Sequence, residues 1–571
     1  MLFYGFVYDD SVIVVHNPVL NGWHSLIGVW THPYWPDGSV GSSGLYRPLF
    51  VTFLAILWNG AQKYAIAFHA FSLAAHVTAT LLLWKLLRRG VGQWPAAAGA
   101  LWFAVHPVHV EAVANISNTS EVLVLIWTLL LILWLYPKSD AFGAPLIELG
   151  WGRAIVGAIL YAAAMLSKES GGVAPALALL VAIAWRPVPA PTFAEAIEQG
   201  RQWIKVVVVC VVTVIGVVFV RRLVMGGITG TSSLAVPGLA ELSGPQRVWT
   251  VFSTGAKVAQ LLLWPTNQVP DYGPSSLLTG FDRTVAATAT IALIVLGVAW
   301  AVQRALRPKQ PDSRALVGVV WCLIAYLPAS NLLAATGAIV AERTLYATSA
   351  GLAMLVAWCL DRVLERAAER RVSLRAGAIV PALAGAIVLA ACVRGFVQTK
   401  DYSRVWRTHE SLFARMVEVD SLNYRGYQLL AGAAKTHKQY AESARLFALA
   451  YARLPSDPIL LTDYGEYLLA MHRPRYALAI AQRLLKHRDV WTDTRAVTLF
   501  LNATGQTWGP DSVLVAARAL NERAPSARSA LFIGMVHELK GDSAAAQAAY
   551  RQGLQIAPTD SALLAHTRMD R

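Results

Sequence analysis

Residues 203–221 read WIKVVVVCVVTVIGVVFVR, and this stretch decides the class of fold. Between Lys205 and Arg221 it carries no charged side chain. A helix that crosses a bilayer needs about 20 consecutive, mostly apolar residues, and a buried helix of a soluble protein is usually shorter. The stretch therefore predicts a membrane-spanning helix and an integral membrane protein.

Nine other stretches have the same character. Together with the first they predict ten spans, at about 64–87, 95–107, 120–137, 154–168, 172–186, 203–221, 285–303, 315–328, 345–360 and 376–394. The chain of 571 residues is 56% hydrophobic and only 15% charged, which is too apolar for a soluble protein of this size. Its net charge of +15 comes from Lys and Arg beside the apolar segments, so we expect no nucleic-acid partner.

The basic residues also orient the chain. They gather after alternate spans, for example near 85–89, 304–314 and 362–375, whereas the turn at 107–120 has none and that at 329–344 has only Arg343. Because basic loops stay in the cytoplasm, we expect both turns, the N-terminus and everything after 394 to be extracytoplasmic. This holds only if two ambiguous apolar stretches, 48–62 and 249–265, lie along the membrane interface.

No signal peptide is visible, and we expect that a first membrane helix has been lost upstream of Met1. A bacterial plasma membrane is the default location, with an endoplasmic-reticulum membrane left open.

After about residue 400 the apolar runs stop and amphipathic helical patterns alternate with short turns. Small and turn residues recur with a period: Gly432 and Gly465 are 33 residues apart, as are Pro525 and Pro558. A period near 34 is that of the tetratricopeptide repeat, although a generic array of helical hairpins would share the architecture. We predict an all-α chain with a membrane helical bundle at 1–398 and an extracytoplasmic repeat solenoid at 399–571.

An acidic pair, Asp9-Asp10 in Phe6-Val7-Tyr8-Asp9-Asp10, precedes the first predicted span. On its own the pair is compatible with a solvated turn. At the membrane–water interface, two adjacent carboxylates are more often catalytic: one takes a proton while the other positions a group or binds a cation. We take them as the candidate catalytic residues.

Two arginines on the same side could bind a phosphate. Tyr46-Arg47-Pro48 places a guanidinium near the interface, where it could clamp a phosphate with two hydrogen bonds or simply anchor to lipid headgroups. Glu342-Arg343 holds the only basic residue of its loop, which makes Arg343 a second candidate.

Lys168-Glu169 lies between two closely spaced spans, either as a functional pair or as an internal salt bridge. His106 and His109, followed by Glu111, end another span. They could hold a metal ion, but the intervening proline makes the helix geometry uncertain, and a hydrogen-bonded polar cluster at the lid of the bundle is the favoured alternative.

Taken in order, these motifs resemble those of the transmembrane and tetratricopeptide-repeat-containing glycosyltransferases of the GT-C superfamily, relatives of the protein O-mannosyltransferases. The motifs that carry the resemblance are Phe6-Val7-Tyr8-Asp9-Asp10, Tyr46-Arg47-Pro48-Leu49, Phe68-His69, His106-Pro107-Val108-His109-Val110-Glu111, Leu166-Ser167-Lys168-Glu169, Leu327-Pro328-Ala329-Ser330-Asn331-Leu332 and Glu342-Arg343-Thr344-Leu345-Tyr346. The resemblance covers nearly the whole chain. The ordered set, rather than any single motif, makes it specific.

The resemblance implies an eleven-helix membrane core and a sugar donor, mannose among the options, linked to a polyprenyl or dolichyl phosphate. It implies that Asp9 is the general base for the acceptor hydroxyl, that Asp10 helps to hold acceptor or donor, and that the sugar carbon is inverted. Arg47, Lys168 and Arg343 would stabilise the leaving phosphate. A divalent cation remains an option, and the repeats would select a protein acceptor.

The chain departs from the family pattern at Asn118-Thr119-Ser120-Glu121, which keeps the acid but lacks the usual arginine. Three functions stay open: transfer to a protein, transfer to a glycolipid or envelope polysaccharide, and a non-enzymatic membrane-anchored scaffold. The many spans with polar ends favour an enzyme over the scaffold. The supporting site residues are Tyr46, His106, His109, Glu111, Glu121, Glu169 and Glu342.

Overall fold

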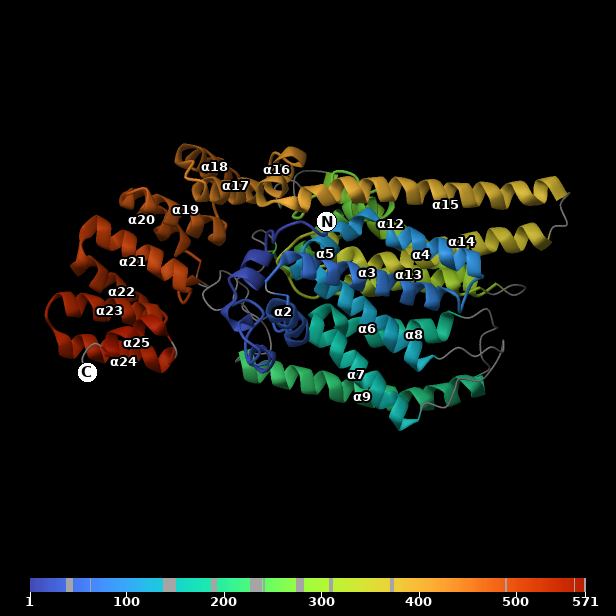
Figure 1. The fold of residues 1–571 in the computed structure, drawn as a ribbon, viewed down its shortest axis with the longest axis horizontal. Coiled ribbons are helices and arrows are strands. Elements are labelled where there is room, and N and C mark those ends of the chain that lie inside the picture. Colours follow the sequence, from blue (N-terminus) through green and yellow to red (C-terminus); the bar gives the residue numbers. More distant parts are fainter. Residues whose placement is uncertain are drawn as a thin grey trace. The chain divides into compact units, whose positions relative to one another are not determined.

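The computed structural model describes residues 1–571 apart from 37–44, 62, 137–149, 186–192, 226–238, 240–241, 274–281, 308–311, 370–373, 488–489, 559 and 569–571. In the part of the chain so described, all regular secondary structure is helical. The chain divides into two compact units, with the boundary between Ser421 and Leu422. Each unit is described by itself below (Figure 1).

The first unit is a bundle of long helices with short ones between them. Its α-helices are α1 (Ser25–Gly28), α2 (Pro48–Gly60), α3 (Ala65–Leu87), α4 (Gln93–Ala104), α5 (Val110–Ala114), α6 (Thr119–Leu135), α7 (Trp151–Ser167), α8 (Ala174–Ala184), α9 (Phe193–Met225), α10 (Gly244–Leu263), α12 (Asp282–Ala305), α13 (Arg314–Tyr326), α14 (Tyr346–Glu369), α15 (Leu374–Ser403) and α16 (His409–Val419).

Short helical turns connect them on the side that carries the candidate site. They are η1 (Ser11–Val15), η2 (Pro18–Leu20), η3 (Pro107–His109), η4 (Ile116–Asn118), η5 (Glu169–Val173), η7 (Leu327–Ala329), η8 (Glu342–Leu345) and η9 (Arg404–Arg407). Each of the ten predicted spans falls on a helix of the structure, and the two ambiguous stretches form α2 and α10.

Six helical segments are long and apolar enough to cross a membrane, and four shorter apolar helices accompany them in the described residues. The six are Ala65–Leu87, Ile116–Leu135, Trp203–Met225, Thr284–Ala305, Glu342–Ala368 and Ile379–Arg407; the four are Pro48–Gly60, Trp151–Ser167, Glu169–Ala182 and Arg314–Ala329. The chain is therefore an integral membrane protein, as predicted, with six rather than ten segments that reach full spanning length.

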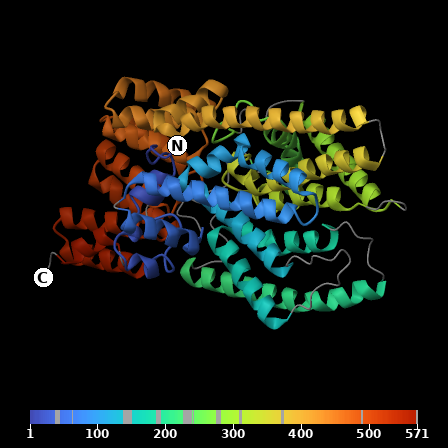
Figure 2. The ribbon, with the colours of Figure 1, turned by 45° about the vertical axis from the view of Figure 1, so that its right-hand side comes forward.

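The centre of the bundle is α6, which packs against α3, α5, α7, α8 and α14. Its apolar window is 83% buried, whereas that of α9 is 6% and those of α12 and α15 are 11% buried. Both views show α9 and α15 along opposite edges of the bundle (Figures 1 and 2). Outer helices that keep Val, Ile and Leu exposed are expected where lipid rather than protein is the neighbour.

The second unit consists of four helical hairpins and a closing helix. The hairpins are α17 (Tyr424–Thr436) with α18 (Tyr440–Arg453), α19 (Pro458–Ala470) with α20 (Pro474–Leu484), α21 (Thr494–Trp508) with α22 (Pro510–Arg523), and α23 (Ala527–Leu539) with α24 (Ser543–Ile556), followed by α25 (Ser561–Arg568). This is the predicted arrangement of tetratricopeptide-like repeats. It begins at about residue 422, while the sequence placed the start of this domain at 399, because α15 runs on to Ser403 and α16 belongs to the first unit.

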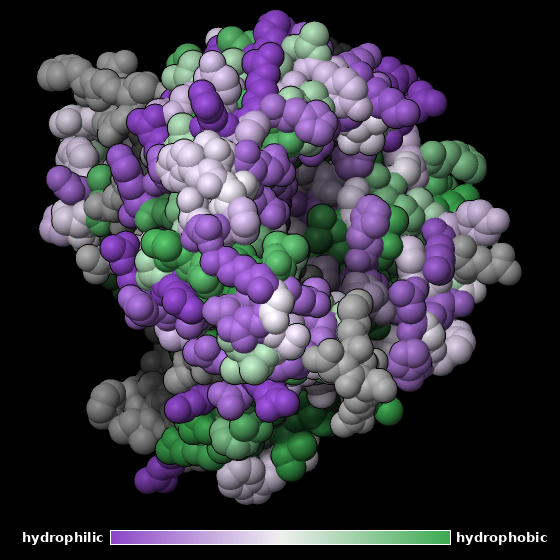
Figure 3. All heavy atoms as spheres, turned by 90° about the vertical axis from the view of Figure 1, so that its left-hand side faces the viewer, coloured by the Kyte–Doolittle hydropathy of each residue, from purple (hydrophilic) through white to green (hydrophobic). Residues whose placement is uncertain are grey.

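The periodic residues have physical roles in the hairpins. A Cβ at Gly465 of α19 would lie 2.5 Å from a methyl carbon of Leu499, so a small residue is needed where two repeats meet. Pro455, Pro525 and Pro558 each follow the end of a second helix, where a residue without an N–H stops the helix. Figure 3 colours one face of the molecule by hydropathy, and hydrophilic side chains predominate on it, with hydrophobic side chains among them.

Candidate functional site

Asp10 fixes the start of the chain to the N-terminal end of α6. Its carboxylate is 1% exposed and accepts four hydrogen bonds. Ser117 donates from its backbone N at 2.8 Å and from Oγ at 2.6 Å, and the backbone N–H groups of Ile116 and Val7 donate at 3.3 and 3.5 Å. Burial raises the pKa of Asp10 to about 7, against the lowering effect of the bonds from Ser117 and Ile116. Both carboxylate oxygens of Asp10 therefore accept hydrogen bonds that tie the start of the chain to η4.

That neighbour, Asp9, is half-buried at the start of η1. Its backbone carbonyl accepts the N–H groups of Val12 and Ile13 at 3.1 and 2.9 Å, which begins the helical turn. Tyr8, just before it, has a φ of 62°, a left-handed conformation that is uncommon for a non-glycine residue and marks a sharp bend. The Asp9 carboxylate interacts electrostatically with the Arg343 guanidinium. The candidate base and Arg343, one of the candidate phosphate ligands, are therefore close enough for their charges to interact.

Each of the three candidate phosphate ligands is paired with a glutamate; Glu111 and Glu121 are buried, whereas the side chain of Glu169 is 31% exposed. Two nitrogens of Arg47 lie 2.9 and 3.0 Å from Glu169 Oε2. The Lys168 ammonium lies 2.7 Å from Glu121 Oε1, and Arg343 pairs with Glu111 through both its guanidinium and its backbone N–H. The paired residues come from five different segments of the bundle, so the fold rather than closeness in sequence brings them together.

The three cations are neighbours. Burial is the main cause that lowers the pKa of Lys168; Glu121 opposes it, and the positive charges of Arg47 and Arg343 lower it further. Arg47 also lies over the ring of Tyr34, with its Cζ 4.5 Å from the centroid, and the Tyr34 hydroxyl donates to the carbonyl of Ser117 at 3.2 Å. Sequence reasoning missed Tyr34, because an isolated tyrosine in a loop carries no pattern.

Of the other predicted residues, Glu342 organises a neighbouring loop. Tyr272 Oη and the backbone N of Val269 donate to its Oε1 at 2.6 and 2.9 Å, and Gln268 Nε2 donates to its Oε2 at 2.8 Å. Tyr46 donates to the carbonyl of Trp30 at 2.8 Å. Both residues therefore hold loops around the site.

His106 and His109 lie in a buried aromatic and polar cluster with His76 and Tyr346. His109 Nε2 is 2.7 Å from Ser349 Oγ, and His76 Nδ1 is 2.7 Å from the Tyr346 hydroxyl. Within the described ranges, no three His, Cys, Asp or Glu side chains are grouped so that they could hold a metal ion. The favoured alternative, a hydrogen-bonded cluster, fits these contacts. The glutamates next to the three cations are ion-paired with them.

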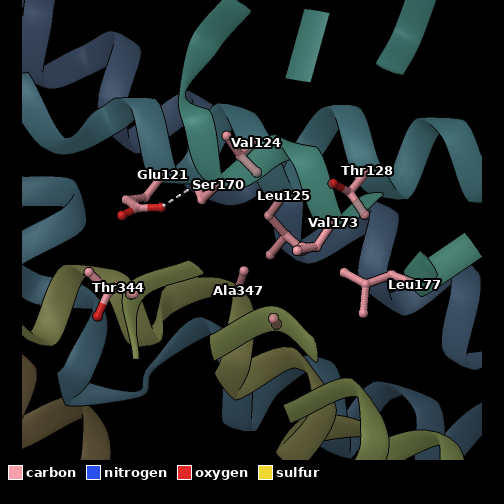
Figure 4. A pocket seen from close by; sticks show the side chains of 11 residues that line it. Glu121, Val124, Leu125, Thr128, Ser170, Val173, Leu177, Thr344 and Ala347 are labelled. Atoms are coloured by element: carbon pink, nitrogen blue, oxygen red, sulfur yellow. Dashed lines mark hydrogen bonds between the residues drawn. The ribbon is translucent and has the colours of Figure 1, made fainter. Parts of the chain in front are cut away.

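A pocket opens beside Lys168 between α6, η5, α8, α13 and α14. Its lining residues are Glu121, Val124, Leu125, Thr128, Ser170, Val173, Leu177, Ala325, Ala329, Thr344 and Ala347. Figure 4 shows that Ser170 and Glu121 are joined at one end by a hydrogen bond of 3.3 Å, while the side chains of Val124, Leu125 and Leu177 continue away from it. The pocket therefore has a polar end next to the cations and an otherwise largely apolar lining. Ser170 was missed by the sequence reasoning, although it directly follows Lys168-Glu169.

No protein-family model matches the chain. The curated proteins that match it include the mouse protein O-mannosyl-transferase TMTC3, which is 24% identical over 495 residues, 84% of this chain and 52% of the relative. The Drosophila melanogaster Tmtc3 is 26% identical over 80% of this chain and 53% of its own length. The Caenorhabditis elegans protein O-mannosyl-transferase F38B6.6 is 27% identical over 62% of this chain and 48% of its own.

The chain is a distant homologue of the TMTC protein O-mannosyl-transferases. This confirms the resemblance deduced from the motifs. The chain spans about half the length of the curated relatives it matches.

Solved structures that match include the repeat protein YrrB, at 18% identity and a TM-score of 0.24 over 37% of this chain and 97% of that one. Yeast Tom70 matches at 10% identity and a TM-score of 0.25 over 88% of this chain and 95% of that one. Scores this low carry no argument about the fold, which rests on the helices themselves.

Proposed function

We propose that this chain is a membrane-embedded glycosyltransferase. It moves a hexose, mannose in view of the names of its relatives, from a polyprenyl-phosphate donor to an acceptor hydroxyl on the extracytoplasmic face. The acceptor is a serine or threonine of a protein. The observation that carries the proposal is a group of three cations, Arg47, Lys168 and Arg343, each ion-paired with a glutamate, together with the electrostatic effect of Asp9 on Arg343.

The chemistry follows from this arrangement. Asp9 takes the proton of the acceptor hydroxyl as that oxygen attacks the anomeric carbon of the sugar, and the bond to the lipid phosphate breaks on the opposite face, with inversion. Negative charge builds on the departing phosphate, where Arg47, Lys168 and Arg343 stabilise it. No step requires a metal ion.

The proposal also includes the arrangement of the helices and the repeats in the membrane. Ten helices traverse a bacterial plasma membrane, with the shorter ones aided by flanking residues and local thinning of the bilayer. The site loops and the repeats face the extracytoplasmic side, where the repeats bind the protein that is to be modified.

The test is transfer from radiolabelled polyprenyl-phosphate sugars by the full chain in lipid nanodiscs, with a periplasmic extract as the source of acceptor. Native chain is compared with Asp9→Asn, which keeps the shape and removes the base. Label that enters protein only with Asp9 intact supports the proposal. Label in lipid or polysaccharide would instead indicate a glycolipid or polysaccharide acceptor. No transfer from any donor, with partners that co-purify equally with Asp9→Asn, would indicate a scaffold.

A further inference from the structure

One histidine outside the predicted site touches the loop that carries Asp9. His409 is the first residue of α16, which starts after η9 at the end of α15. Its Nδ1 lies 3.4 Å from the backbone N of Tyr8, and its Nε2 lies 3.2 Å from Ser11 Oγ. The imidazole therefore bridges the residue before Asp9 and the residue two after it.

The partners determine the tautomer of this imidazole. The backbone N–H of Tyr8 can only donate, so Nδ1 must accept and carry no proton. The proton of the neutral ring is then on Nε2, which donates to Ser11 Oγ. Burial lowers the pKa of His409, with Glu410 opposing, and this favours the neutral ring that the two contacts need. A single uncharged side chain thus satisfies one donor and one acceptor of the loop.

Aromatic packing supports the same contact. The rings of Tyr8 and Phe413 meet edge to face with centroids 6.2 Å apart, and the rings of His409 and Phe413 are 5.6 Å apart. Thr408 caps α16 by accepting the N–H of Ser411 at 3.2 Å, so the first turn that presents His409 is itself fixed.

We propose that His409 is a positioning residue for the Asp9 loop, which it clamps through Tyr8 and Ser11 while Asp10 anchors the same loop to η4. The proposal rests on the function proposed above, since it assigns His409 a part in placing the general base. Two independent sets of hydrogen bonds then hold the loop that carries Asp9: those of the Asp10 carboxylate and those of the His409 imidazole. A misplacement of about 1 Å at a reacting group can lower a rate by about 100-fold.

Two substitutions separate the contacts. His409→Asn keeps an acceptor at the Nδ1 position for the Tyr8 N–H, and His409→Gln keeps a donor near the Nε2 position for Ser11. His409→Ala removes both. Glu418→Ala on the same helix is the matched control, because Glu418 is exposed and pairs with Arg415 only at the surface.

The first measurement is amide hydrogen exchange of the full chain in nanodiscs, which reports local opening and needs no donor. We expect faster exchange over residues 7–13 in His409→Ala, partial recovery in His409→Asn and in His409→Gln, and native exchange in Glu418→Ala. The second measurement is sugar transfer: turnover by His409→Ala falls about 10- to 100-fold with the KM for the donor unchanged, and His409→Asn restores most of it.

The outcomes separate the two proposals. Native exchange and native turnover in His409→Ala, with Asp9→Asn inactive, would overturn the role of His409 and leave the glycosyltransferase standing. A native chain that transfers no sugar would overturn the function, while the exchange data would still decide whether His409 holds the loop. His409→Ala could also raise hydrogen exchange throughout the bundle, and its loss of turnover would then not be specific to the loop. In that case His409→Asn decides: if this variant has native exchange in the bundle but does not regain turnover, the positioning role is refuted.

Discussion

Replacement of Asp10 by asparagine tests the central contact of the site. Asparagine has one carbonyl oxygen, which can accept both hydrogen bonds from Ser117. Its amide nitrogen then faces the N–H groups of Ile116 and Val7, which donate to the native carboxylate at 3.3 and 3.5 Å. Two weak bonds are lost, at a cost of about 1–3 kcal/mol that does not depend on pH.

The native carboxyl adds a contribution that does depend on pH. Its pKa rises from the ordinary value of 3.8 to about 7 in the folded chain because burial disfavours the charged form. The folded state therefore holds this proton more tightly than the unfolded state does. The stability that Asp10 contributes is fully present below its unfolded pKa and is lost as the pH rises through its folded pKa. Between pH 5 and pH 8 the loss amounts to about 2–3 kcal/mol.

Urea unfolding in mild detergent, followed by tryptophan fluorescence at pH 5, 6, 7 and 8, measures this contribution. The free energy of unfolding of Asp10→Asn, minus that of the native chain, should become more positive by about 2–3 kcal/mol from pH 5 to pH 8. Asp401→Asn, at an exposed carboxylate near the end of α15, is the control and should leave the difference flat. Parallel curves for native chain and Asp10→Asn would show that Asp10 does not titrate in this range and would refute the reasoning.

Three further predictions concern packing and charge elsewhere. Gly534→Ala should destabilise the repeats by about 1–3 kcal/mol in thermal unfolding, because the new Cβ would lie 2.2 Å from the fully buried Tyr550 ring. Gly432→Ala, with nothing within 4 Å of its Cβ, should instead stabilise α17 by up to about 1 kcal/mol in the same assay. Arg314→Leu should cost about 3–5 kcal/mol in detergent unfolding, because it leaves buried carboxylates such as Asp361 without their cation; unchanged unfolding would contradict the buried network.

Hydropathy predicted the helices well because lipid selects for long apolar runs, but it placed their ends poorly. The span predicted at 203–221 is part of α9, Phe193–Met225, and the one predicted at 376–394 is part of α15, Leu374–Ser403. Polar and charged residues can continue a helix into the headgroup region, where its backbone hydrogen bonds remain favourable. A hydropathy window therefore detects only the apolar middle of each helix and not its polar ends.

The site residues were predictable by type, but their partners were not. Lys168 and Glu169 are adjacent in the sequence, yet Lys168 pairs with Glu121 and Glu169 pairs with Arg47. Lys168 has an extended backbone, with φ −165° and ψ 151°, and successive side chains of an extended segment point to opposite sides. His409 was missed because its contact with the loop spans about four hundred residues of sequence, a separation that no local pattern reveals.

The same geometry accounts for the missing arginine near Asn118. The acid of that motif, Glu121, keeps a cation, but the cation is Lys168 from the turn between α7 and η5, with Ser170 as a second donor to the carboxylate. The motif therefore retains its charge by drawing on another segment of the chain. Each of the three cations has a glutamate partner, and two of these glutamates, Glu111 and Glu121, are buried, so the positive charges are compensated inside the protein without a donor. Under the proposed function, the phosphate of a lipid-linked donor would therefore compete with a carboxylate for each of these cations.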